Sequence, residues 1–224
     1  TTTTTYTLTE TITATGCQNT STVVVTVNPL PVADVGSNQV ICTGTSTSIG
    51  APTVAGNTYS WSPVTGLSST TVSDPIANPT VTTTYTLTET ITATGCQNTN
   101  TVVVTVNPLP AAAVGSNRII CRGASTVIGA IAIAGNTYSW SPITGLSSAT
   151  ASDPTANPTI TTTYTLIETI TATGCQNTNT VVVTVNPLPA AIVGSDQVIC
   201  NGVSTTLGAA SVAGNTYNWS PATG

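Results

Sequence analysis

The feature that most constrains this chain is an internal repeat of 79 residues, which extends over nearly all of its 224 residues. Repetition at a fixed period is typical of tandem arrays of small structural units. Three sets of residues keep this spacing: Cys17, Cys96 and Cys175; Cys42, Cys121 and Cys200; and Trp61, Trp140 and Trp219. We expect complete units at residues 31–109 and 110–188, the C-terminal part of a unit at 1–30 and the N-terminal part of another at 189–224. Because half-units would expose unpaired strand edges, we expect these residues to be a section of a longer array.

Charged side chains are scarce. They make up 4% of the residues, the net charge is −5, and Arg118 and Arg122 are the only basic residues. Binding to nucleic acid requires clusters of Lys or Arg, so we expect no nucleic-acid partner. No run of about 18 apolar residues occurs, which predicts no membrane span in this sequence. The many β-branched residues favour a folded β protein over a disordered chain.

Alternating apolar and polar residues predict β-strands in each unit. In segment 83–94, Tyr85 and Leu87 alternate with threonines, which indicates one buried face and one face covered by hydroxyl groups. Segment 97–107 would form the second strand of the same hairpin. Turn signals recur about every 8–12 residues, and we find no helical periodicity. We therefore predict an all-β fold with about seven short strands per unit, arranged as an antiparallel β-sandwich.

Aromatic residues are the main candidates for the core. Tyr59 and Trp61 fall on one face of a strand, and such a pair is more typical of a sandwich core than of a sugar-stacking platform. The expected core aromatics are Tyr59, Trp61, Tyr85, Tyr138, Trp140 and Tyr164. Glu89 falls on the same inner face as Tyr85, where an unpaired carboxylate would be costly. We expect a β-bulge or the end of the strand to release Glu89 from the core.

Two prolines lie at each expected boundary between units. They are Pro29 and Pro31, Pro108 and Pro110, and Pro187 and Pro189. A Pro-Leu-Pro segment is too short for a flexible linker and favours an extended, semi-rigid backbone. We therefore expect the units to follow one another as a rod.

Several short motifs together resemble a known class of repeat. The most informative are Ile41-Cys42-Thr43-Gly44, Tyr59-Ser60-Trp61-Ser62-Pro63 and Gly95-Cys96. In these motifs the chain resembles the PKD-like and Ig-like repeats of large secreted Bacteroidetes surface proteins, including gliding-motility adhesins. The resemblance implies tandem Ig-like sandwiches, export to the cell surface or medium, and a role in a stalk, adhesive or filament. Relatives commonly carry an Asp-x-x-Gly-Cys turn, whereas Thr92-Ala93-Thr94-Gly95-Cys96 has no Asp, which puts a calcium role in doubt.

The six cysteines favour disulfides and an oxidising compartment over a zinc site, which would require closely spaced Cys or His ligands. Two pairings are open. Bonds within units would join Cys42 to Cys96 and Cys121 to Cys175. In an Ig-like order, however, Cys42 and Cys96 lie at opposite ends of a strand that spans roughly 26 Å, whereas bonded Cα atoms lie about 5.5 Å apart. Stacking of units would instead bring Cys42 near Cys175, which we slightly favour. Cys17 and Cys200 would have partners outside this sequence.

Catalytic chemistry has no support in the sequence. There is no His or Lys to activate a nucleophile, and each carboxylate stands alone, so we expect neither an enzyme nor a metal or cofactor site. We predict a structural extracellular repeat protein that forms a stiff stalk or filament, with neighbouring repeats and possibly other chains as its partners. The alternative is an adhesin whose repeats bind glycans or surfaces directly. A minor alternative is an ice-binding array of threonines.

Overall fold

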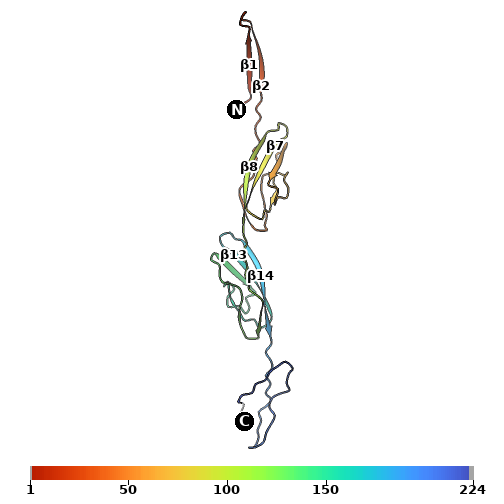
Figure 1. Ribbon diagram of the computed structural model, residues 1–224, viewed down its shortest axis with the longest axis vertical. Coiled ribbons are helices and arrows are strands. Elements are labelled where there is room, and N and C mark those ends of the chain that lie inside the picture. The colour runs from red at the N-terminus through yellow and green to blue at the C-terminus, as the bar shows by residue number, and fades with distance from the viewer. Residues whose placement is uncertain (1, 222–224) are drawn as a thin grey trace.

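The computed structural model describes residues 2–221 of the chain. Figure 1 shows four bodies that follow one another along the longest axis. The first is a hairpin of β1 (Thr4–Thr11) and β2 (Gln18–Val25). Two sandwiches come next, and residues 190–221 form the last body, in which no strand is assigned.

The first sandwich contains six strands within residues 39–107. They are β3 (Gln39–Cys42), β4 (Thr47–Ser48), β5 (Asn57–Ser62), β6 (Ile76–Ala77), β7 (Thr83–Ile91) and β8 (Gln97–Asn107). Four of them form a sheet in the order β3-β8-β7-β5, and the short strands β4 and β6 pair in the opposite layer. The sandwich is therefore asymmetric, because one layer is a regular sheet and the other consists mostly of turns and loops.

The second sandwich repeats this arrangement within residues 118–186. Its strands are β9 (Arg118–Cys121), β10 (Thr126–Val127), β11 (Asn136–Ser141), β12 (Thr155–Ala156), β13 (Thr162–Ile170) and β14 (Gln176–Asn186). The sheet order is β9-β14-β13-β11, and β10 pairs with β12. The described residues contain no helix, and therefore none that could span a membrane. The protein is an all-β chain of tandem Ig-like sandwiches.

Two details differ from the sequence-based prediction. The strand pairs are antiparallel except at one edge of each four-stranded sheet, where β3 runs parallel to β8 and β9 runs parallel to β14, with Cys42 opposite Asn107 and Cys121 opposite Asn186. Each sandwich has six strands instead of about seven, because residues 31–35 lie against the core without joining a ladder. Ala33 has a φ of 53°, in the left-handed region, which interrupts the extended backbone there.

The large aromatic side chains lie on the inner face of the sheet, as the alternation of apolar and polar residues along the strands predicts. Trp61, Tyr85, Trp140 and Tyr164 are buried, whereas Tyr59 and Tyr138 are half-buried and pack against the core. The indole N–H of Trp61 donates to the carbonyl of Val72 at 2.9 Å, and the Tyr85 hydroxyl donates to the carbonyl of Thr65 at 2.8 Å. These bonds tie the loop layer to the sheet. Burial raises the pKa of the Tyr85 hydroxyl above its ordinary value, which favours the neutral form that donates this hydrogen bond.

Gly50 lies where the loop layer packs tightly on itself and on the Trp61 ring of the sheet. It has a φ of 86°, and a Cβ at this position would collide with the carbonyl oxygen of Ser73 and lie 3.1 Å from the Trp61 ring. Gly56 has a similar φ of 84° but has open space at the same point. Both glycines therefore need a positive φ, but only Gly50 has neighbouring atoms in the space that a Cβ would occupy.

We predict that Gly50→Ala destabilises the first sandwich by about 3 kcal/mol or more, because the backbone at residue 50 must move away from the Ser73 carbonyl and the Trp61 ring. Gly56→Ala, the matched control, should cost only about 1–2 kcal/mol, since it adds backbone strain without a collision. Hydrogen exchange of residues 57–62 measures the effect, with residues 136–141 as the internal reference. Equal losses of protection in the two variants would contradict the packing explanation.

Candidate functional site at the joint between units

The two sandwiches are joined by Pro108, Leu109 and Pro110. On the first sandwich, the carbonyl of Asn107 at the end of β8 accepts hydrogen bonds from Thr43, one from the backbone N–H at 2.9 Å and one from Oγ1 at 3.1 Å. The last residue before the joint is thus held to the end of β3. The chain has no free length between the sheet and the prolines.

A disulfide crosses this joint. It links Cys42, at the end of β3, to Cys175 of the second sandwich, with a Cα–Cα distance of 5.6 Å. Cys175 is fully buried, whereas its equivalents Cys96 and Cys17 are half-buried and exposed, respectively. The two cysteines are 133 residues apart in the sequence, and the closed loop runs from the end of β3 to the turn between β13 and β14. The disulfide therefore fixes one sandwich against the next at a point away from the backbone linker.

The pairing is the between-unit alternative, and the within-unit pairing does not occur. Cys96 and Cys121 are free thiols in the structure, as are Cys17 and Cys200. The reason is geometric. Cys42 lies opposite Asn107, and Cys96 directly precedes Gln97 at the other end of β8. A strand of that length separates the two cysteines by about 33 Å.

The turn between β13 and β14 presents Cys175 in a defined position. The backbone N–H of Gly174 donates to Ile170 O at 2.8 Å, and the N–H of Ile170 donates to Cys175 O at 3.0 Å. The turn is also tied to the neighbouring loop, since the N–H of Thr171 donates to Gly135 O at 2.8 Å. Gly174 has a φ of 72°, a conformation that glycine adopts without strain. These hydrogen bonds fix the backbone that carries the sulfur of Cys175.

A buried glutamate anchors the other side of the joint. Glu168 accepts the backbone N–H of Ala112 on Oε2 and the side-chain amide of Asn136 on Oε1, both at 2.7 Å. The side-chain amide of Asn177 donates to the carbonyl of Pro110 at 2.9 Å. These bonds hold the incoming backbone from residue 110 to residue 112. The linker is therefore clamped at both ends.

The same arrangement corrects our expectation for Glu89. The registers of β7 with β5 and with β8 run through Glu89 without a bulge, and its side chain is only 3% exposed. Its carboxylate accepts the N–H of Ala33 and the amide of Asn57, each at 2.7 Å. Neither a bulge nor the strand end releases this glutamate, because the buried N–H of Ala33 and the half-buried amide of Asn57 satisfy its carboxylate where it lies. Burying a carboxylate is tolerable when it is hydrogen-bonded in this way.

The six prolines of the three joints differ in burial according to their position. Pro31 and Pro110, which begin the two sandwiches, are buried, whereas Pro189 at the equivalent place is exposed. Pro29, Pro108 and Pro187 are exposed. Leu109 is 39% exposed, and its equivalents Leu30 and Leu188 are each 62% exposed. The joint between the two sandwiches thus covers more of its leucine than the other two joints do.

Sequence reasoning identified the cysteines and prolines but missed the hydrogen-bonding residues of the joint. Asn136, Asn177 and Glu168 recur at a spacing of 79 with Asn57, Asn98 and Glu89. The sequence did contain one signal, which was a glutamate on the inner face of a strand. A buried carboxylate needs hydrogen-bond donors nearby. Among residues 2–221, no group of three Cys, Asp or Glu side chains could hold a metal ion.

Comparisons with known proteins add little beyond this description. No family model matches the chain, and neither does any curated protein. Among solved structures, a titin fragment of three immunoglobulin domains is 10% identical, with a TM-score of 0.42 over 82% of this chain and 75% of that chain. Extracellular domains 3–5 of Drosophila OTK are 12% identical, with a TM-score of 0.39 over 81% of this chain and 70% of that chain. The assignment of the fold rests on the strands and their pairing.

We predict that Glu168→Ala destabilises the second sandwich by about 2–4 kcal/mol, because it leaves the N–H of Ala112 and the amide of Asn136 without their acceptor. Glu10→Ala is the matched control, since Glu10 is the exposed equivalent in β1. It should change the stability of either sandwich by less than about 0.5 kcal/mol. Urea unfolding followed by hydrogen exchange of residues 136–141 measures both. An unaltered second sandwich in Glu168→Ala would show that the glutamate does not anchor the joint.

Proposed function

We propose that this chain is part of a structural extracellular array whose repeats form a stiff stalk or filament. Its units would comprise residues 31–109 and 110–188, with parts of further units at 1–30 and 189–224. The observation that carries the proposal is the disulfide from Cys42 to Cys175 across a three-residue linker. A disulfide between two sandwiches restricts how one unit moves relative to the next. A disulfide within one sandwich would stabilise only that unit.

Two separate connections restrict motion at the joint. A lone linker allows neighbouring domains to swing and twist, even when it is short. The disulfide adds a second connection, so hinge motion that separates the two ends would require breaking a covalent bond. The hydrogen bonds from Thr43 and Asn177 remove slack on either side of the prolines. Repetition of this joint would make the array behave as a quasi-one-dimensional stiff object.

The disulfide also supports an extracellular location, since such bonds persist in oxidising compartments. The sparse charge of the chain would offer little electrostatic repulsion between neighbouring arrays, which favours lateral association into a filament. The partner in this proposal is thus another part of the same kind of array.

Direct glycan binding by the repeats stays a prediction. Stacking against a sugar requires an exposed aromatic face, whereas Trp61 and Trp140 are each 2% exposed in the two sandwiches. This burial favours the structural function over the adhesive one. The ice-binding alternative likewise stays a prediction, and thermal hysteresis of the whole chain would test it.

We expect the double variant Cys42→Ser/Cys175→Ser to bend at the joint while both sandwiches stay folded. Small-angle scattering of the monomeric fraction, taken directly from a sizing column, should show a broader range of end-to-end distances than the oxidised parent chain. Cys17→Ser, which removes a thiol that is free in the structure, should scatter like the parent.

The proposal fails if the double variant and the parent chain give the same scattering curve, since the disulfide would then add no stiffness. It also fails if the oxidised parent already scatters as two freely jointed bodies. Circular dichroism verifies that the sandwiches remain folded in each variant.

A further inference from the structure

The disulfide gives the chain a second covalent route through both sandwiches. Along the backbone, Pro31 at the start of the first sandwich and Asn186 at the end of β14 are 155 residue steps apart. The other route runs from Pro31 to Cys42, crosses the disulfide to Cys175 and continues to Asn186. This second route, which we call the tether, has only eleven residue steps on either side of the disulfide. It leaves out residues 43–174, which lie inside the closed loop of the disulfide.

The first half of the tether already lies extended along the sheet. The side-chain amide of Asn98, near the start of β8, donates to the carbonyl of Pro31 at 2.9 Å. At the other end, Cys42 lies opposite Asn107 in the parallel pair of β3 and β8. Eleven residue steps of the tether thus accompany nine steps of β8, a distance of about 30 Å at the rise of a strand.

The second half of the tether is β14. Cys175 directly precedes this strand, which ends at Asn186. From Cys175 to Asn186 the backbone covers about 36 Å at the rise of a strand. Figure 1 shows β8 and β14 in successive bodies, both directed along the longest axis of the molecule. Both halves of the tether therefore lie in the direction along which an array would be pulled.

The folded tether is close to its greatest possible length. Its two halves and the 5.6 Å between the Cα atoms of the disulfide span about 70 Å when they lie end to end. Fully extended, the same residues and the disulfide reach at most about 80–85 Å. Pulling can therefore lengthen the two sandwiches by only about 10–15 Å before the tether is taut. The backbone route alone would allow a length of more than about 500 Å.

The remaining slack lies in the first half of the tether, where hydrogen bonds hold it to the sheet. Ala33 and Gly36 have positive φ values of 53° and 71°, which turn the backbone away from a straight strand. The N–H of Ala33 donates to Glu89 at 2.7 Å, and Asn38 Oδ1 accepts the N–H of Val103 at 2.9 Å. These bonds resist a small tension. A larger tension would draw out the slack and then act on covalent bonds alone.

We propose that the tether carries tension along the array, so that the pulling force passes beside the cores of the two sandwiches and leaves them folded. The force enters at Pro31, crosses from Cys42 to Cys175 and leaves through β14. The disulfide holds the two ends of residues 43–174 together, so tension on the tether does not stretch them. The array is then nearly inextensible as well as stiff.

The small cores of the sandwiches make a separate path for tension useful. Each sandwich has one four-stranded sheet and only a two-stranded pair in the opposite layer. Domains of this size have limited stability, and a domain under load lengthens at a rate set by its unfolding. A stalk that carried tension through such domains would lengthen as they opened. A covalent tether keeps its length whether or not the domains are strong.

The inference deepens the proposed function, because it states how the proposed stalk resists stretching, and it rests on that function for the direction of the load. The two can fail separately. Scattering measures bending at the joint of a relaxed chain, whereas the tether is tested by the length of the chain under tension.

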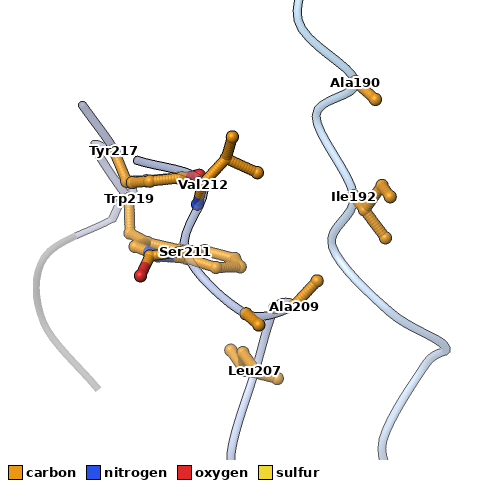
Figure 2. A pocket seen from close by; sticks show the side chains of 10 residues that line it. Ala190, Ile192, Leu207, Ala209, Ser211, Val212, Tyr217 and Trp219 are labelled. Atoms are coloured by element: carbon orange, nitrogen blue, oxygen red, sulfur yellow. Dashed lines mark hydrogen bonds between the residues drawn. The ribbon is translucent and has the colours of Figure 1, made fainter. Parts of the chain in front are cut away.

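The experiment stretches single oxidised chains of 224 residues, held in optical tweezers by peptide tags fused to both ends. The segments outside the tether should extend first in every variant. Residues 190–221 contain no assigned strand, and Figure 2 shows Leu207 and Trp219 on the wall of a pocket of about 140 Å³ instead of in a packed core. Once these segments are extended, the parent chain should lengthen no further than the tether allows.

The parent chain should reach a total length of about 300–330 Å, because only residues 1–42 and 175–224 can extend. Its stretching and relaxation curves should superimpose at high tension, since the sandwiches stay folded. Cys42→Ser/Cys175→Ser should instead show two further steps of about 220–240 Å each as its sandwiches unfold, and should reach about 740–800 Å.

Cys96→Ser/Cys121→Ser is the matched control. It removes one turn cysteine and one cysteine at the end of a strand, both of which are free thiols in the structure. It should extend like the parent chain. The length of the parent decides the question by itself, so the test holds even if Cys42→Ser/Cys175→Ser does not fold.

Two outcomes would overturn the proposal. The first is a parent chain that shows the two large steps, because the load would then pass through the sandwiches. The second is a parent chain that stays short but relaxes along a different curve at high tension, which would show that the sandwiches open under load. Either result, obtained on a chain whose scattering indicates a stiff joint, would remove the tether and leave the proposed function standing.

Discussion

The structure depends on the covalent bond that crosses from one sandwich to the next. Each sandwich has a single well-formed sheet and a thin loop layer, so its own core is small. The disulfide from Cys42 to Cys175 fixes the position of the second sandwich relative to the end of β3 in the first. Because Cys175 sits in a hydrogen-bonded turn and Cys42 at the end of a paired strand, neither side can adjust freely. The joint is therefore a structural element and not merely a connection.

The glutamates explain how so short a linker can lead into a core. Glu89 and Glu168 are buried charged residues in a protein with very few charges. Each accepts the backbone N–H of an alanine whose φ is positive, 53° at Ala33 and 46° at Ala112. The strained backbone and the buried carboxylate are each unfavourable alone, and the hydrogen bond between them offsets both. The chain thereby turns from the linker onto the sheet within a few residues.

Much of the fold could be predicted from local patterns, because alternation along a strand depends only on neighbouring residues. The hairpin of β7 and β8 and the burial of Tyr85 and Trp61 are of this kind. The parallel pairing of β3 could not be predicted in the same way, since it joins residues more than 60 positions apart. Of the joint, the cysteines and prolines were identifiable by type. The donors that satisfy Glu89 were not, because Ala33 contributes only its backbone.

The most direct measurement is peptide mapping of the unreduced chain under conditions in which it is monomeric. A fragment pair that contains Cys42 and Cys175 is the result this account predicts, together with free thiols at Cys96 and Cys121. A fragment pair that contains Cys42 and Cys96 would place the bond inside a unit. The joint would then lose its second connection, and the account of a stiff array would be contradicted.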